Sequence, residues 1–189
     1  METQKMDLLH QKIAEQIIEM IPAEWKKVIL YAEILDDSSE VFFYFNTPHS
    51  EDFIYSHNIP EHYHVSEEIY EELLFDLHDL FEELRDEFKE NNQDIWTNLT
   101  LNLGISGEFS IDYNYEDVIQ FPYTISQRQT IWTYKNVGIY PKSKPLKSFL
   151  EQYLNLIPPS FIGGRFFDTN DPYKLPIIML EAHPCWKMN

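Results

Sequence analysis

The chain has 189 residues, and its 32 Asp and Glu against 14 Lys and Arg give a formal net charge of −18. This balance argues against a protein that grips nucleic acid through a basic surface, because phosphate neutralisation needs cationic side chains. A hydrophobic content of 43% excludes an acidic disordered tail, and a single Cys excludes a disulfide scaffold. The length fits one domain with a short appendage.

The acidic residues are concentrated in the first two-thirds of the chain. Residues 1–134 hold 28 acidic and seven basic side chains, a net charge of −21, whereas residues 135–189 hold four and seven, a net charge of +3. No segment resembles a signal peptide or a membrane-spanning helix. We therefore expect a soluble, cytoplasmic protein whose electrostatic function lies in the acidic part.

The N-terminal half predicts a helix, a hairpin and a second, longer helix. Leu9, Ile13 and Ile17 recur at helical spacing up to Pro22, which ends the first helix. The β-branched and aromatic runs 28–35 and 41–45 predict a hairpin, and residues 53–57 predict a third strand. Ser66 is the expected N-cap of a helix over residues 67–91, whose apolar stripe includes Ile69, Tyr70, Leu73, Leu74, Leu77, Leu80, Phe81, Leu84 and Phe88.

Two further strands and two helices follow. Leu99, Leu101 and Leu103 alternate with polar residues, a turn contains Gly104 and Gly107, and residues 109–113 alternate in the same way. The pattern Ser126-Gln127-Arg128-Gln129 predicts a capping box that opens a helix ending near Gly138. A last helix is expected over residues 146–156, and residues 157–189 show no clear periodicity. The fold class is α+β, an antiparallel sheet of about 4–5 strands with helices packed on one face.

The long helix is the first candidate for partner binding. Between Glu68 and Glu90 it carries ten acidic residues against Arg85 and Lys89. A solubilising surface normally mixes both signs, whereas a surface of one sign accelerates association with an oppositely charged partner. A merely solvated outer face is the competing interpretation. The candidate contact residues are Glu72, Asp76, Asp79, Glu83, Asp86 and Glu87.

The second candidate follows the last predicted strand, where acidic and aromatic residues are interleaved. Its candidate contact residues are Asp112, Tyr115, Glu116 and Asp117, because carboxylates pair with Lys or Arg and tyrosine supplies contact area at low entropic cost. The alternative is a strand end followed by an acidic helix start. Asp36 and Asp37 are adequately explained by turn chemistry.

Catalytic interpretations fit the sequence less well. The clustered carboxylates with His57, His62 or His64 leave a metal-assisted hydrolase as the alternative function, but no metal-ligand spacing accompanies them. Cys185 has no nucleophile context, and Gly163-Gly164-Arg165 is too short for a phosphate loop. We therefore expect no enzyme activity, no cofactor and no metal.

Several ordered blocks resemble the YezG-like (EsaG-like) family of bacterial immunity proteins. They include residues 1–18, Tyr31-Ala32-Glu33-Ile34, Trp96–Leu101 and, most specifically, Ile111–Asp117 followed by Arg128, Ile131-Trp132 and Val137-Gly138. The resemblance covers about residues 1–154, which it implies are an immunity domain, and leaves 155–189 as a Pro-rich extension.

The resemblance also implies a function. Family members are cytoplasmic antitoxins that bind the C-terminal nuclease domain of an LXG or EsaD-type toxin exported by type VII secretion. It implies protection of the producing cell during competition between bacteria, with a protein partner, no direct nucleic-acid contact and no membrane contact. A chaperone that holds the toxin unfolded before export is a third possibility.

Overall fold

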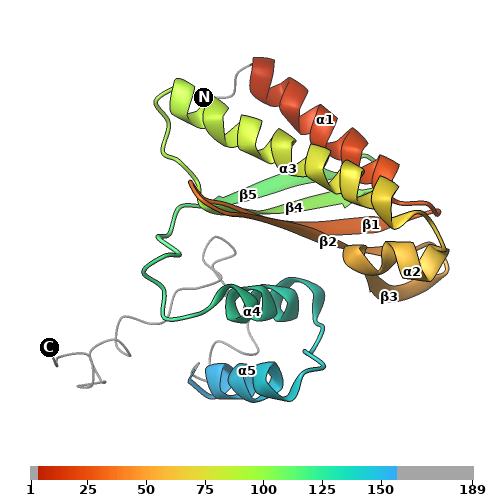
Figure 1. The fold of residues 1–189 in the computed structure, drawn as a ribbon, viewed down its shortest axis with the longest axis vertical. Coiled ribbons are helices and arrows are strands. Elements are labelled where there is room, and N and C mark those ends of the chain that lie inside the picture. The colour runs from red at the N-terminus through yellow and green to blue at the C-terminus, as the bar shows by residue number, and fades with distance from the viewer. Residues whose placement is uncertain (1–3, 157–189) are drawn as a thin grey trace, which may run out of the picture. The chain divides into compact units, whose positions relative to one another are not determined.

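The structure, a computed structural model, describes residues 4–156, and their elements form an α+β fold (Figure 1). This confirms the predicted fold class. The elements are α1 (Gln4–Met20), β1 (Lys27–Ile34), β2 (Ser39–Thr47), β3 (Ser50–Tyr55), a short 3₁₀ turn (Ser56–Asn58), α2 (Ile59–Tyr63), α3 (Glu67–Glu90), β4 (Asn98–Gly104), β5 (Phe109–Asn114), α4 (Ile125–Val137) and α5 (Lys144–Leu156).

The chain divides into two compact units between Ile119 and Gln120. The first unit, residues 1–119, contains the sheet with α1, α2 and α3, and the second begins at Gln120 and contains α4 and α5. The division lies inside the domain 1–154 that the sequence analysis proposes. The predicted extension 155–189 falls almost entirely outside the described residues, as do Cys185 and Gly163-Gly164-Arg165, so these predictions stay open.

The five strands are all antiparallel, in the order β3-β2-β1-β4-β5. At the centre, Leu30 of β1 lies opposite Phe43 of β2 and Leu101 of β4. All three side chains are fully buried in the core of the first unit. Since side chains alternate between the faces of a sheet, the neighbouring Tyr31 lies on the second face, where its hydroxyl donates to Glu33 Oε2 at 2.6 Å.

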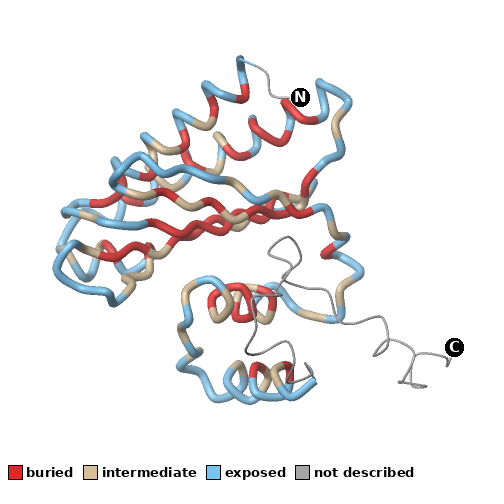
Figure 2. The backbone as a smooth tube through the Cα atoms, turned by 180° about the vertical axis from the view of Figure 1, so that it is seen from behind, coloured by how far each residue is buried: buried red, intermediate tan, exposed pale blue. Residues whose placement is uncertain are grey.

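Helices α1 and α3 lie side by side on one face of this sheet (Figure 1). Met6, Leu9, Ile13, Ile17 and Met20 form the buried stripe of α1 and join the core with residues of β1, β2 and β4. Figure 2 shows buried positions recurring along each helix and gathered in the sheet. Each helix therefore keeps one polar face outside this core.

Helix α3 has nearly the predicted bounds, and Ser66 is its N-cap, whose hydroxyl accepts from Ile69 N at 3.3 Å. One residue of the predicted apolar stripe is placed wrongly, because Ile69 is 59% exposed. The third strand is also shifted: it spans Ser50–Tyr55 instead of residues 53–57, because the 3₁₀ turn already begins at Ser56.

The predicted capping box at Ser126 is wrong by two residues. The N-cap of α4 is Thr124, whose hydroxyl accepts from Gln127 N at 3.3 Å, while Gln127 Oε1 accepts from Thr124 N at 2.9 Å. Ser126 lies inside the helix, and its carbonyl accepts from the hydroxyl of Thr130. The predicted end is confirmed, since Gly138 caps the helix in a left-handed conformation with φ +78°.

Candidate protein-binding surface

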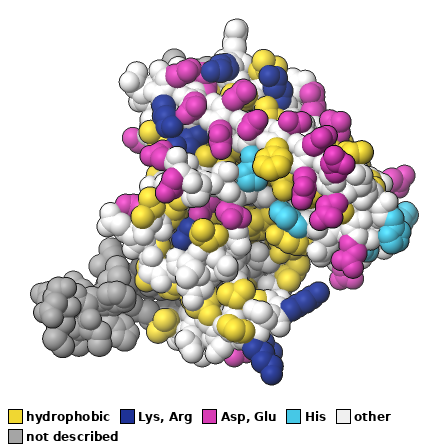
Figure 3. All heavy atoms as spheres, in the orientation of Figure 1, with side chains coloured by type: hydrophobic (Ala, Val, Ile, Leu, Met, Phe, Trp, Pro, Cys, Tyr) yellow, Lys and Arg dark blue, Asp and Glu magenta, His cyan; other side chains and the backbone are white. Residues whose placement is uncertain are grey.

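The outer side of α3 carries the largest group of exposed carboxylates in the first unit. Residues 1–119 hold 28 acidic and six basic side chains, a net charge of −22. Of the eleven acidic residues in α3, ten are exposed and Glu87 is buried. Figure 3 shows acidic side chains spread over this helix, with Lys and Arg gathered near its C-terminal end. We call the exposed acids of α3 the α3 acidic surface: Glu67, Glu68, Glu71, Glu72, Asp76, Asp79, Glu82, Glu83, Asp86 and Glu90.

The cations of the first unit neutralise only the C-terminal part of this surface. Lys89 Nζ lies 2.9 Å from Asp86 Oδ1, and Lys5 Nζ lies 3.3 Å from Glu90 Oε2. Within residues 4–156, no Lys, Arg or His forms an ion pair with the acids from Glu67 to Glu83. The N-terminal two-thirds of α3 therefore present negative charge that a partner can neutralise.

Glu87 does not belong to this surface. Its side chain is 6% exposed, and its Oε2 lies 2.8 Å from Lys5 Nζ while its Oε1 accepts from Asn91 Nδ2 at 2.8 Å. These hydrogen bonds raise the pKa of the Lys5 ammonium above its usual range, with Glu87 the larger cause and Glu90 the smaller. Glu87 thus ties α3 to α1.

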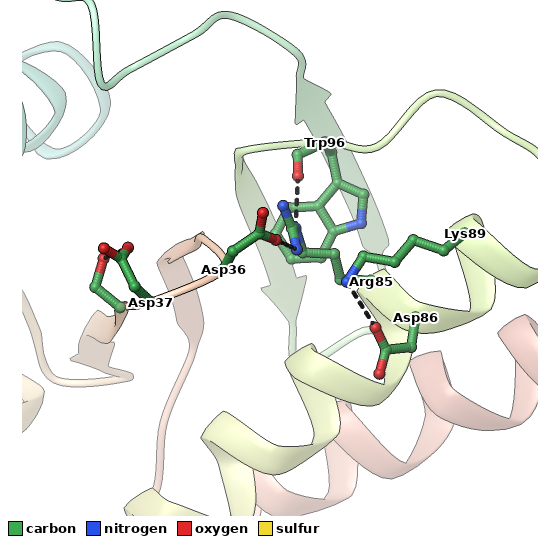
Figure 4. A network of polar contacts seen from close by, with 7 residues as sticks. Asp36, Asp37, Arg85, Asp86, Lys89 and Trp96 are labelled. Atoms are coloured by element: carbon green, nitrogen blue, oxygen red, sulfur yellow. Dashed lines mark hydrogen bonds and ion pairs between the residues drawn. The ribbon is translucent and has the colours of Figure 1, made fainter.

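Arg85 lies beside a polar hollow between α3 and the β1–β2 turn (Figure 4). Its Nη1 donates to Asp36 Oδ1 at 2.8 Å and its Nε donates to the carbonyl of Trp96 at 3.3 Å. The hydrogen bond from Arg85 holds the pKa of the Asp36 carboxyl below its usual range. Because the guanidinium of Arg85 joins α3 to two other segments of the first unit, the β1–β2 turn and the residues before β4, this hollow is a structural junction.

The segment Asp112–Asp117 is divided between contact residues and structural residues. Asp112 and Asp117 are exposed and Tyr115 is 51% exposed. Glu116 is partly buried: its N–H donates to Asn114 Oδ1 at 2.8 Å, and its carbonyl accepts from the Thr97 hydroxyl at 2.8 Å. Only three of the four predicted contact residues in this segment are therefore well exposed.

Asp112 does not lie on the same side of the sheet as the α3 acidic surface. Tyr113 packs against the core beneath α1 and α3. Asp112 is its neighbour in β5 and pairs with Thr100, so its side chain projects from the opposite face. Asp112 and the α3 acidic surface therefore cannot both contact one flat partner surface.

The three histidines of the hydrolase alternative have different surroundings. His57 accepts or donates a hydrogen bond with the Ser56 hydroxyl at 3.2 Å and stacks on Tyr55, whereas His62 and His64 are exposed at the end of α2. Among residues 4–156, no group of three or more His, Cys, Asp or Glu side chains has an arrangement that could hold a metal ion. The same residues include no helix that is both long and apolar enough to cross a membrane.

Phe75 is the exposed residue on α3 that the sequence analysis does not single out. Its side chain is 69% exposed, and Glu71, Glu72, His78 and Asp79 lie three or four residues away on the same side of the helix. The spacing of the acidic residues is the sequence signal for this exposure. Acidic residues lie one turn before and one turn after Phe75, so its side chain cannot belong to the buried stripe.

Comparison with known proteins shows the family to which the chain is related, which the surface alone does not. The family model described as "Immunity protein YezG-like" matches residues 6–151. The chain belongs to the YezG-like immunity protein family. This confirms the resemblance seen in the sequence, and the match extends from the first unit into the second.

Three curated relatives agree with this membership. The chain is 60% identical over 154 residues to Immunity protein YezG of Bacillus spizizenii, covering 82% of this chain and 96% of the relative. It is 50% identical over 151 residues to Immunity protein YezG of Bacillus subtilis, covering 80% and 100%. It is 38% identical over 141 residues to Type VII secretion system protein EsaG of Staphylococcus aureus, covering 75% and 86%. A role in immunity to a toxin follows from the family.

Proposed function

We propose that this YezG-like protein binds and neutralises the C-terminal nuclease domain of a cognate LXG or EsaD-type toxin exported by type VII secretion. It acts in the cytoplasm as a stoichiometric inhibitor and not as an enzyme. The α3 acidic surface is the docking surface, and the exposed residues Asp112, Tyr115 and Asp117 at the end of β5 are a second candidate contact.

The single observation that carries this proposal is the unneutralised charge of α3 between Glu67 and Glu83. A nuclease must attract a polyanion, so its substrate-binding surface carries Lys and Arg. A rigid row of carboxylates complements such a surface, raises the association rate and occupies the site that would hold phosphates. The relative EsaG is named a type VII secretion system protein, and this name supports an exported toxin as the partner.

The first experiment is a nuclease protection assay. The purified protein is titrated into the C-terminal domain of the toxin encoded by the neighbouring gene, and plasmid cleavage is followed. We expect cleavage to stop when the two proteins are equimolar. Continued cleavage by a fully active nuclease in the presence of excess protein would overturn the proposed function.

The salt dependence of association tests the electrostatic part separately. The association rate is measured at about 0.05 M and 0.5 M salt, where screening lengths differ about threefold. We expect a steep fall in the rate at high salt, since charge steering is a rate effect. Binding to the full-length toxin without inhibition of the isolated nuclease domain would instead favour the chaperone alternative.

A further inference from the structure

We infer that Phe75 is the anchor of toxin binding by the α3 acidic surface, inserting into an apolar pocket whose rim on the toxin carries Lys or Arg. The inference rests on the proposed function and deepens it by naming the chemistry of the docking site. The partner is a basic protein surface with a pocket of aromatic size.

The position of Phe75 gives it no role in the core of the first unit. The buried side chains of α3 include Tyr70, Leu77 and Phe81, and these join the core beneath the helix. Phe75 lies two residues before Leu77 and is 69% exposed, on the opposite side of the helix. Isolated exposed aliphatic residues are common and need no explanation, but an exposed aromatic ring in the middle of a long helix offers about the largest contact area available to a partner.

The backbone beneath Phe75 is rigid, which favours an anchoring role. The residue lies eight positions after the start of α3 and fifteen before its end, and Ser66 caps the first turn. A phenylalanine side chain has two rotatable bonds, so immobilising it in a pocket costs little conformational entropy. Interface hot spots are typically such preorganised aromatic residues surrounded by polar contacts.

The residues around Phe75 specify the charge of the pocket's rim. Glu71, Glu72 and Asp79 lie one turn away, and Glu68 and Glu82 lie two turns away. All five are exposed, and none forms an ion pair within residues 4–156. Cations on the partner would therefore face carboxylates on both the N-terminal and the C-terminal side of the inserted ring.

The same charges argue against other occupants of this surface. A second copy of the chain would bring an equally acidic helix against the first and would be repelled, because a two-fold interface apposes identical surfaces. Nucleic acid and anionic lipid are repelled in the same way. A basic protein surface is the occupant that fits both the ring and its surroundings.

The test compares three variants in binding and in nuclease protection, with the toxin's C-terminal domain as the probe. Phe75→Ala removes the anchor. The triple change Glu71→Gln, Glu72→Gln, Asp79→Asn removes the surrounding charge. Ile105→Ala, in the β4–β5 turn, is the matched control because Ile105 is also apolar and 63% exposed.

We expect Phe75→Ala to weaken the affinity by about 30-fold or more, mainly through faster dissociation, at both low and high salt. We expect the triple change to slow association at low salt and to have little effect at about 0.5 M salt. Ile105→Ala should bind like the wild type, and all three variants should keep the wild-type melting temperature.

The outcomes separate the two proposals. If the wild type binds and neutralises the toxin and Phe75→Ala does so equally well, the anchor is wrong and the proposed function stands. If Phe75→Ala and Ile105→Ala lose affinity to the same extent, the effect is not specific to the pocket and the inference also fails. If the wild type does not bind the toxin domain, both proposals are overturned.

Discussion

The ammonium group of Lys5, in the first turn of α1, lies 2.8 Å from the buried carboxylate of Glu87, in the last turn of α3. The pair joins the two helices that cover the sheet. Glu87 also accepts a hydrogen bond from Asn91 Nδ2, which helps to close the C-terminal end of α3. An acidic residue of this helix can therefore stabilise the fold instead of being available to a partner.

Glu87→Gln should separate these two roles. The substitution removes the charge that Lys5 faces but keeps an oxygen for Asn91, so we expect a loss of about 1 kcal/mol in the free energy of unfolding. Toxin affinity should stay within about twofold of wild type, a margin of about 0.4 kcal/mol. The control is Glu83→Gln, at an exposed position of the α3 acidic surface. It should keep the free energy of unfolding and weaken the toxin affinity. Urea denaturation and a binding titration measure both quantities.

Arg85→Met should destabilise the protein by about 1–3 kcal/mol, because the side chain of Arg85 is buried and its loss leaves the Trp96 carbonyl without this charged donor. Lys89→Met is the control, since Lys89 forms an exposed pair with Asp86 one turn away in α3. Equal stabilities for the two variants in chemical denaturation would contradict a junction role for Arg85.

His78 should make the fold less stable as the pH falls. Burial is the main cause that lowers the pKa of His78, and the nearby His57 lowers it further while Asp79 opposes the shift. The unfolded chain then binds protons more readily than the folded protein below about pH 6.5, so stability is lost as the pH falls through this range.

We expect His78→Gln to flatten the dependence of the melting temperature on pH between about 7.5 and 5.5. Glutamine keeps a polar partner for the Ser39 hydroxyl, which lies 2.9 Å from His78 Nδ1. His49→Gln, an exposed substitution just before β3, is the control for replacing a histidine by glutamine. An unchanged slope in His78→Gln would show that other groups carry the pH dependence.

The double change Asp112→Asn, Asp117→Asn tests the second candidate contact. Asparagine keeps the Oδ1 that accepts from Ile119 N, so the turn after β5 should survive. Because Asp112 and α3 lie on opposite sides of the sheet, we expect this change to weaken neutralisation less than the triple change on α3. The opposite ranking in the nuclease protection assay would move the docking surface to the end of β5.

Thr124→Ala should destabilise α4 by about 1 kcal/mol, because it removes the hydroxyl that caps the helix. Ser126→Ala is the matched control, since only its backbone carbonyl is seen to bond within α4. Circular dichroism during thermal unfolding of both variants checks the difference. A larger loss for Ser126→Ala would contradict the observed cap.

The sequence predicts α3 well because a capping residue and a strict apolar period agree over 24 residues. It fails at the start of α4, where Thr124-x-x-Gln127 and Ser126-x-x-Gln129 both satisfy the same pattern and only tertiary contacts choose between them. Glu87 was misplaced for a similar reason: it lies beside the buried stripe, and its partner Lys5 is distant in sequence.

The candidate surface could be predicted only in part. The excess of acidic residues is visible in composition, and the family was recognisable from ordered blocks such as Ile111–Asp117. That Asp112 projects away from α3 depends on the pairing of β5 with β4 and on which face the helices cover. The β4–β5 pairing is local and follows from the predicted turn, whereas the face that α3 covers depends on packing between segments far apart in the sequence.

On α3, the side chains that hold the fold and those offered to a partner come from the same 24 residues but from different positions of the helical turn. An exchange at Phe75 or Asp79 leaves Leu77 and Phe81 in place, so the outward stripe can change without repacking the interior. The outward and inward stripes of the helix can therefore vary independently of each other. Under the proposed docking by α3, a few outward substitutions would change which toxin is bound while the stability contributed by the inward stripe is retained.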